Sequence, residues 1–453
     1  MQDIQAVRNA NLKRVVYIAL CFMVFFTAYI VTQNLISTIY KQLGYSSLGQ
    51  ICIFFVCGTT GVVCTVATHY TNKISFKTGL VAGGSAIAAL ILAGAMTTFC
   101  NDFNIQGAIC NSFSISLINV IASMSVGVGG SFLWLCQAKY VNDCSDEQTK
   151  GIFNGIFWSL FQTNQIIGSA LATLLLGSFQ ASSFFCLLLV FAGVALVMLN
   201  FVQPPVKNTS QGSKEEETNA QDKQESGIDA FKSFMSLFSD RKNYFLFAAL
   251  FFGGLAIGSY INFMGAYVTS TLDLPADLSA EEKDMKIRQN VGFAFLVLAI
   301  GEVAAGLSVG KLADKFDKLK LFTGTLMFNE AALAVTLLAV LTKSYTLCVI
   351  AAFMWGYGDT GINTMVNAVI GSIFNGKTEL FSAYRCLMSF GTMYSSALAI
   401  FIPTDIPSLY IIAIAGSMLA CHMLYNKYLP RSQKMSQHLL DDHQKILVEL
   451  KNF

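Results

Sequence analysis

The sequence predicts an all-α polytopic membrane protein in which twelve transmembrane helices form two halves of six. Three observations lead to this prediction: the composition is strongly apolar, apolar runs of membrane-spanning length recur along the chain, and one long polar segment divides them into two groups. Of the 453 residues, 54% are apolar and only 12% are charged, whereas a soluble globular protein carries about 25% charged residues. These values exclude a single soluble domain, a coiled coil and a disordered regulator.

Twelve apolar runs are long enough to cross a membrane, because a bilayer core of about 30 Å requires about 20 apolar residues per helix. They cover residues 15–40, 48–68, 76–97, 112–137, 150–177 and 182–203, and then 243–268, 290–310, 319–341, 344–373, 378–402 and 406–428. Five of the six prolines fall between or beyond these runs, and the sixth, Pro407, is the second residue of the last run. This placement supports the assignment, because proline interrupts helix interiors.

The polar segments divide the chain into an N-terminal half (1–203), a linker (204–242), a C-terminal half (243–428) and a tail (429–453). The linker is too polar to bury a core. In the tail, leucine and isoleucine alternate with charges, which indicates an amphipathic helix. Ser279 precedes Glu282 by three residues, the spacing of a capping box, and predicts a short helix outside the membrane.

The distribution of lysine and arginine predicts the orientation. If the N-terminus is cytoplasmic, 23 of the 29 basic residues lie on the cytoplasmic side, 5 lie on the opposite side, and Arg385 lies within a span. The positive-inside rule therefore places both termini and the linker in the cytoplasm. The only glycosylation sequon, Asn208-Thr209-Ser210, lies in the linker and is expected to stay unmodified. No sorting signal is clear, so the organelle stays open, with the plasma membrane and endolysosomes as the main expectations.

A loop in the second half carries a family signature. The run GKLADKFDKLK at 310–320 resembles the loop Gly-x-Leu-x-Asp-Arg-x-Gly-Arg of the major facilitator superfamily, with Gly310 and Asp314 in place and Lys315 and Lys318 at the basic positions. We expect Asp314 to face a helix N-terminus and the lysines to face anionic headgroups. The alternative is that these lysines are only positive-inside charges. In the first half, Asn72 occupies the position of Asp314.

Four further segments resemble the UNC-93 family of facilitator-like proteins. They are TQNL at 32–35 with LGYSSLG at 43–49, GIFNGIFWSLFQ at 151–162, GYGDTGINT at 356–364 and ELFSAYR at 379–385. The resemblance covers the membrane core of both halves but not the linker, the 276–289 loop or the tail. It implies a facilitator fold of twelve helices. It also implies a role in regulating potassium channels or in escorting other membrane proteins.

Ionisable side chains occur deep in the spans of the second half only, at Glu302, Glu330, Asp359 and Arg385. Each costs at least about 2.5–3.5 kcal/mol at the centre of a membrane helix and so requires a reason. Asp359 is either an ion-binding or proton-accepting carboxylate, a hinge element, or the ion-pair partner of Arg385, and the pair is the preferred interpretation. Glu302 is either a proton-coupling group or a neutral acid in a helix interface, with the interface preferred. For Glu330 we expect an interface.

The first half offers neutral polar groups instead. Asn154, Trp158, Gln162 and Gln165 recur at spacings of four, four and three, so they share one face of a helix. This face either lines a central cavity or forms hydrogen bonds between helices. Together with Asp359, Glu302 and Arg385, the residues Asn154, Trp158 and Gln162 are our candidate cavity or ion-binding residues.

Several functional classes have no support. The net charge of +2 does not suggest a nucleic-acid partner. The chain has no phosphate-binding loop and no nucleophile elbow, and no cysteine or histidine cluster offers a metal site. We therefore expect no cofactor, no metal and no enzymatic activity. Cys100 and Cys110 flank a loop on the predicted non-cytoplasmic side, where a disulfide would form in an oxidising compartment; the spacing alone leaves this open.

Two functions remain. The family resemblance favours a regulatory or accessory subunit of another membrane protein, such as a potassium channel. The intramembrane carboxylates favour a secondary transporter of a small solute, coupled to protons or cations. The expected partners are thus the lipid bilayer and a second membrane protein, or else a small solute or ion.

Overall fold

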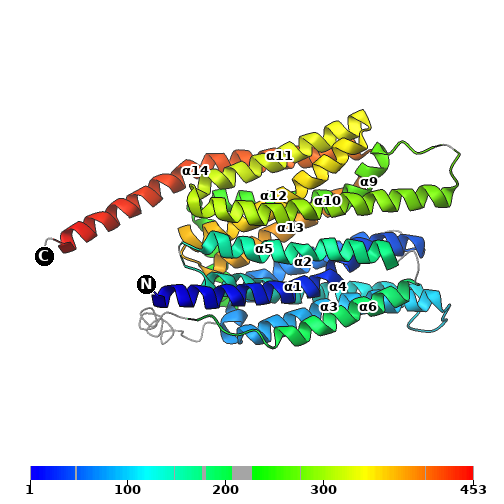
Figure 1. Ribbon diagram of the computed structural model, residues 1–453, viewed down its shortest axis with the longest axis horizontal. Coiled ribbons are helices and arrows are strands. Elements are labelled where there is room, and N and C mark those ends of the chain that lie inside the picture. Colours follow the sequence, from blue (N-terminus) through cyan, green and yellow to red (C-terminus); the bar gives the residue numbers. More distant parts are fainter. Residues whose placement is uncertain are drawn as a thin grey trace.

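A computed structural model of the protein consists of helices and the connections between them (Figure 1). It describes residues 2–45, 48–146, 148–175, 180–206, 227–275, 277–402 and 405–451. The first group is α1 (Gln2–Gln42), α2 (Leu48–Lys73), α3 (Phe76–Asp102), α4 (Ser112–Cys144), α5 (Lys150–Leu175) and α6 (Ala181–Leu199). After α8 (Gly227–Ser239) and η1 (Arg241–Asn243) come α9 (Tyr244–Thr271), α10 (Ala280–Lys315), α11 (Lys318–Thr342), α12 (Tyr345–Ile373), α13 (Thr378–Phe401) and α14 (Pro407–Lys451). The described part of the chain contains no strand, so the all-α prediction is confirmed.

Nine helices are long and apolar enough to cross a membrane, counted within the residues that the structure describes. The other long helices, α5, α12 and α13, coincide with the three remaining predicted spans but are more polar. They carry Asn154, Trp158, Gln162, Asp359 and Arg385 of the candidate residues, whereas Glu302 lies on α10. The full count of twelve spans therefore stays a prediction.

Several helices extend beyond the predicted spans. Ser279 and Glu282 form the expected capping box, but it opens the 36-residue helix α10 and not a separate short helix. Such a helix is about 54 Å long at 1.5 Å per residue and exceeds the ~30 Å bilayer core. The Ser279 backbone and side chain both hydrogen-bond to the exposed Glu282 carboxylate and so lower its pKa. At the other terminus, α14 continues through the predicted tail, although the side chains of 430–453 and residues 207–226 of the linker lie outside the described residues.

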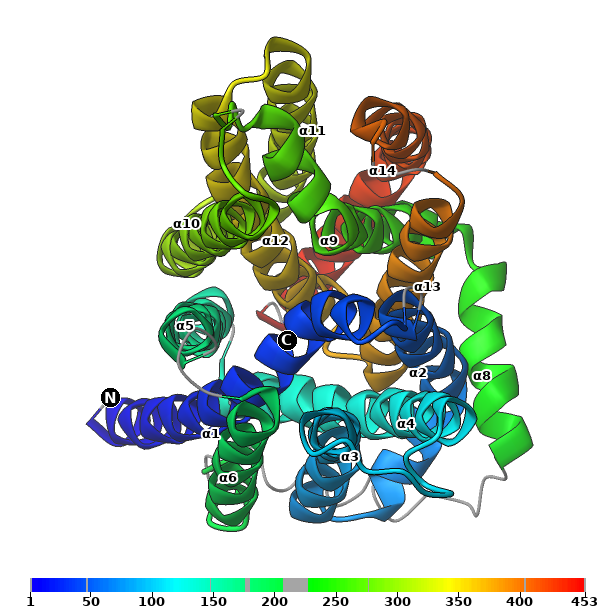
Figure 2. The ribbon, with the colours of Figure 1, turned by 90° about the vertical axis from the view of Figure 1, so that its right-hand side faces the viewer.

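Buried apolar side chains form two clusters. One is drawn from residues 15–202. The other is drawn mainly from residues 234–425 and includes a few side chains of α2 and α4. The two groups of helices meet where α5 packs against α10 and α2 packs against α13 (Figure 2). A site between them is therefore built mainly from these helices and from α12, which packs against both α5 and α10.

Small residues bring α5 and α10 into backbone contact. A Cβ atom on Gly155 would overlap the carbonyl oxygen of Gly306 and lie 3.0 Å from the Cα of Gly310. A larger side chain at Gly155 would thus force the helices apart, as in other small-residue interfaces of membrane proteins. Gln165 of α5 is consequently held within hydrogen-bonding distance of Glu302 on α10.

Both chain termini lie at one end of the bundle, which we call the termini end (left in Figure 1). The connections from α3 to α4 and from α9 to α10 lie at the opposite, far end. A disulfide joins Cys100 to Cys110 across the α3–α4 connection, with their Cα atoms 5.5 Å apart. Disulfides persist in oxidising compartments, so this bond agrees with the predicted orientation, in which the far end faces away from the cytosol.

A single substitution tests this orientation. Asp277→Asn places an asparagine two residues before Ser279, with Leu278 between them, and so creates a glycosylation sequon in the α9–α10 connection. In eukaryotic cells we expect the variant to become glycosylated, because this loop would face the lumen. The readout is a gel shift that an N-glycosidase removes.

The wild-type chain is the first control, since its natural sequon at Asn208 should stay unmodified. The second control is Asp277→Asn combined with Ser279→Ala, which destroys the new sequon and should show no shift. A shift of the wild type that is no larger in Asp277→Asn would reverse the predicted orientation, because both chains carry the Asn208 sequon.

Candidate functional site

The polar face of α5 meets three helices of the C-terminal group in succession. Trp158 lies beside Arg385 of α13, with 5.8 Å between the indole centroid and the guanidinium carbon. One turn later, Gln162 Nε2 donates to Thr360 Oγ1 of α12 at 3.4 Å. Gln165 Nε2 then donates to Glu302 Oε1 of α10 at 3.0 Å. Asn154, the fourth residue of this face, donates to the Lys150 carbonyl of its own helix and does not reach across.

Glu302 is completely buried at the contact between α5 and α10. Gln165 is its only hydrogen-bond partner among the described residues, and the second carboxyl oxygen, Oε2, has none. Gly356 of α12 lies directly against this turn, because a Cβ atom there would overlap the Leu298 carbonyl and lie 3.2 Å from Glu302 Cγ. A buried carboxylate without a counter-charge is costly. This site thus favours a proton or a cation on Glu302.

Asp359 lies in the middle of α12 and is 6% exposed. Its carboxyl oxygens accept hydrogen bonds from the hydroxyl of Tyr260 at 3.0 Å and from Nδ2 of Asn363 at 2.7 Å. The Asp359–Asn363 contact follows from helix geometry, since residues four apart lie on one face. Among the described residues, Asp359 therefore has polar hydrogen-bond partners but no salt bridge to a cationic side chain.

Arg385 is surrounded by aromatic rings and not by carboxylates. Its guanidinium carbon lies 4.5 Å from the Trp134 ring centroid and 4.3 Å from that of Tyr384, distances typical of cation–π interactions. Its Nε and Nη2 atoms are buried and have no hydrogen-bond partner among the described residues.

The ion pair between Asp359 and Arg385 that we preferred from the sequence is not formed, since no salt bridge joins them in the described part of the chain. The physical reason is that the two side chains point in different directions. Arg385 points toward α4 and α5, whereas Asp359 contacts α9. The two are connected indirectly, because the Tyr384 hydroxyl donates to Asn363 Oδ1 and Asn363 donates to Asp359.

The signature loop at 310–320 connects the two halves at the termini end. The Asp314 carboxylate accepts hydrogen bonds from the backbone N–H of Gly151 at 2.9 Å and of Ile152 at 2.7 Å, at the first turn of α5. It thus caps a helix of the other half of the chain, where the helix dipole favours negative charge. Lys315 is exposed and Lys318 is half-buried. The side chain of Asn72, at the equivalent position of the first half, lies outside the described residues.

Two further contacts lie at the same end. Lys150 Nζ donates to the Gly371 carbonyl of α12 at 2.6 Å. Arg8 Nε contacts Asp146 Oδ2 at 2.5 Å in the α4–α5 connection. Partial burial raises the pKa of Asp146, but hydrogen bonds from Arg8, Thr149 and the Gln148 backbone outweigh it and hold the pKa below its usual value. This bond thus persists at neutral pH and weakens only as the pH falls below the usual carboxyl range, near 4.

Several residues of this arrangement escaped the sequence analysis. Asn363 and Tyr384 lie in the segments that carry the family resemblance, and the spacing from Asp359 to Asn363 was a usable signal. The sequence carried no signal for Trp134 and Tyr260, because they lie on α4 and α9 and not on the helices of Asp359 and Arg385. At the periphery, Glu330 of α11 contacts His422 Nδ1 of α14 at 2.7 Å, which agrees with the expected interface role of Glu330.

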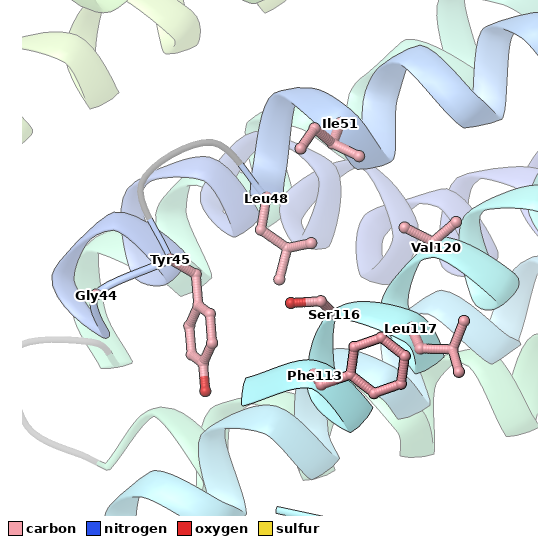
Figure 3. Close-up of a pocket in the computed structure, with 8 residues that line it drawn as sticks. All are labelled: Gly44, Tyr45, Leu48, Ile51, Phe113, Ser116, Leu117 and Val120. Carbon is pink, nitrogen blue, oxygen red and sulfur yellow. The ribbon is translucent and has the colours of Figure 1, made fainter. Parts of the chain in front are cut away.

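A surface groove at the far end is not part of this site. It has a volume of about 430 Å³ and lies between the α1–α2 turn and the start of α4 (Figure 3). Its lining is mostly apolar and contains no carboxylate or basic side chain: Gly44, Tyr45, Leu48, Ile51, Phe113, Ser116, Leu117 and Val120. Such a groove offers apolar contact but no chemistry.

Comparisons with known proteins agree with the fold. A family model described as the Major Facilitator Superfamily matches residues 105–396. The chain is 22% identical over 427 residues to the UNC93-like protein MFSD11 of Xenopus tropicalis, with 87% of this chain and 90% of the relative covered. It is 25% identical over 196 residues to the UNC93-like protein 3 of Arabidopsis thaliana, with 41% and 36% covered.

Among solved structures, a bacterial homologue of the iron transporter ferroportin in an outward-facing state with soaked iron is similar, with a TM-score of 0.66. The sequence identity is 13%, and the match covers 92% of this chain and 98% of the other. At this identity the likeness shows the fold alone.

The Asp314 cap can be tested by hydrogen–deuterium exchange. Asp314→Ala removes both acceptors of the α5 N-terminus, and loss of such a cap costs about 0.5–2 kcal/mol. We expect exchange at the first turn of α5, around Gly151 and Ile152, to accelerate by roughly 2- to 30-fold.

Asp317→Ala is the matched control, because Asp317 caps its own helix by accepting from the Lys320 N–H at 2.8 Å. It should accelerate exchange at the start of α11 only. Unchanged exchange at α5 in Asp314→Ala would show that this cap does not hold the termini end together.

Proposed function

The chain belongs to the major facilitator superfamily as an UNC-93-like member, and we propose that it is a secondary transporter of a small solute. In this proposal the carboxyl groups of Glu302 and Asp359 bind the coupling proton or cation. The fold supports it, because facilitator proteins bind solutes near the bilayer midplane, between their two halves.

One observation carries the proposal: three ionisable side chains lie at or next to the interface between the halves, without an ion pair among them. Glu302, Asp359 and Arg385 come from α10, α12 and α13, and α5 contacts Glu302, Arg385 and Thr360, the neighbour of Asp359. A purely structural interface would be more stable with apolar side chains or with paired charges. Intramembrane ionisable groups that face the bundle interior typically mark ion and substrate pathways.

The unpaired oxygen of Glu302 provides a place for the coupling ion. With Oε1 held by Gln165, Oε2 is available for a proton or a cation. Because Glu302 and Gln165 lie on opposite sides of the α5–α10 interface, separating the halves breaks their hydrogen bond and exposes the carboxyl group. Ion binding is thereby coupled to the contact between the halves.

The contacts across the interface are compatible with alternating access. They run from Asp314 at the termini end, through the glycine contact at Gly155, to the level of Glu302. These contacts between α5 and α10 are polar, or they join small residues, so the two helices can separate here without exposing a large apolar surface. Lys150 adds a hydrogen bond to the Gly371 carbonyl of α12 at this end.

The regulatory role is the other candidate. It rests on the family resemblance, and no contact in the described residues favours a particular membrane-protein partner. It therefore stays a prediction from sequence.

Reconstitution tests the transport proposal. The purified protein is placed in liposomes that contain a pH-sensitive dye, and a panel of organic acids, amines and sugars is added outside. We expect at least one solute to produce a proton flux. Glu302→Gln and Asp359→Asn should each reduce it by roughly tenfold or more, because a neutral amide cannot exchange a proton.

Glu330→Gln is the matched control, since it removes an intramembrane carboxyl group at the peripheral α11–α14 contact and should leave the flux unchanged. Full flux in Glu302→Gln and Asp359→Asn would assign these groups a structural role. No flux with any solute, together with a stoichiometric membrane protein that co-purifies, would favour the regulatory role.

A further inference from the structure

We propose that the solute carries an oxyanion group, a carboxylate or a phosphate, and that Arg385 binds it. This inference rests on the proposed transport function and names the class of its substrate. It is based on the surroundings of Arg385, a cation inside the bundle that forms no salt bridge in the described part of the chain and whose Nε and Nη2 have no acceptor there.

The guanidinium of Arg385 is positioned but not neutralised. The rings of Trp134, Trp158 and Tyr384 contact it from α4, α5 and α13. Aromatic rings stabilise a cation weakly and accept no in-plane hydrogen bond. Nε and Nη2 therefore have donor capacity that nothing in the described residues uses. Arg385 as a whole is nevertheless only half-buried, so the protein does not enclose it completely.

Additional unpartnered polar atoms lie on the two helices, α4 and α5, whose indoles contact the guanidinium. The indole N–H of Trp158 is buried without an acceptor, and both polar side-chain atoms of Gln137 lack partners among the described residues. Gln137 lies one turn after Trp134 on α4, so both face the same side of that helix. Trp158 and Gln137 are 3% and 1% exposed. Buried polar groups in proteins are almost always paired, so this cluster of donors indicates a ligand rich in acceptors.

The two nearby carboxyl groups do not supply the missing counter-charge. Asp359 is held by Tyr260 and Asn363 on the far side of Tyr384, and Glu302 is held by Gln165. An oxyanion is the ligand that matches the remaining chemistry, because a planar guanidinium binds carboxylates and phosphates through two parallel hydrogen bonds. The stacked indoles of Trp134 and Trp158, 5.7 Å apart, offer an apolar surface to the rest of the solute.

Tryptophan fluorescence provides a binding test that does not depend on transport. The chain has three tryptophans, two of which flank Arg385, while the third, Trp355, donates to Thr336 within the C-terminal group. The Trp355→Phe protein in detergent therefore reports on the site alone. The probes are sodium acetate, succinate, benzoate and phosphate, each against sodium chloride at equal ionic strength.

We expect at least one of the four oxyanions to change the fluorescence saturably. Arg385→Gln should weaken its binding by roughly tenfold to a hundredfold, the effect of losing hydrogen bonds to a charged group. Arg385→Lys keeps the charge but not the paired geometry and should give an intermediate loss, which keeps the test valid if Arg385→Gln does not fold. The responding probe separates carboxylate from phosphate.

Two results would overturn the proposal: no saturable response to any of the four probes beyond that to chloride, or equal affinity in wild type and both variants. The liposome assay separates this failure from that of the transport function. Coupled flux of a cationic or neutral solute that survives Arg385→Gln refutes only the oxyanion. Saturable oxyanion binding without flux of the bound anion refutes only transport.

Discussion

The structure depends on one constraint: polar and ionisable side chains inside a bilayer obtain partners from the protein, because lipid provides none. Glu302, Asp359 and Arg385 are satisfied to different degrees. Among the described residues, Asp359 accepts hydrogen bonds from Tyr260 and Asn363, Glu302 has one bond from Gln165, and Arg385 has aromatic contacts but no hydrogen-bond partner for its Nε and Nη2. Of these three, the less satisfied groups are those that contact α5 of the other half. This gradient supports the proposed site over a purely structural network, in which every group would be paired.

The same constraint explains why the more polar helices lie where the two halves meet. The helices α5, α12 and α13 are too polar to face lipid along their full length, so α5 packs against α10, α13 packs against α2, and α12 packs against α5 and α10. Close packing is possible because glycine occupies the contact points, as at Gly155. Asp314 then connects the halves through backbone N–H groups of α5. Because this bond is polar and local, it breaks without loss of either apolar cluster.

The sequence predicted features that lie within a single helix, but it missed most of the side-chain contacts that form between two helices. Apolar runs located the helices, the Ser279–Glu282 spacing located a cap, and the α5 spacings placed Trp158, Gln162 and Gln165 on one face. Pairings between helices were harder, because sequence order does not fix how two helices are rotated. The expected contact of Asp359 with Arg385 was wrong for this reason, and the ring cage around Arg385 involves Trp134 from a distant helix.

The indirect connection between Arg385 and Asp359 has a thermodynamic consequence. Tyr384 packs on the guanidinium and donates to Asn363, which in turn donates to Asp359. The two opposite charges partly compensate each other through this chain, although they are too far apart to form an ion pair. An anion that neutralises Arg385 leaves the negative charge of Asp359 uncompensated in a low-dielectric interior. In the proposed transporter, the loaded state of lowest free energy would therefore hold the anion together with a proton or a cation. Because such coupling is reciprocal, each of the two ligands would increase the affinity for the other, and this mutual dependence is what cotransport requires.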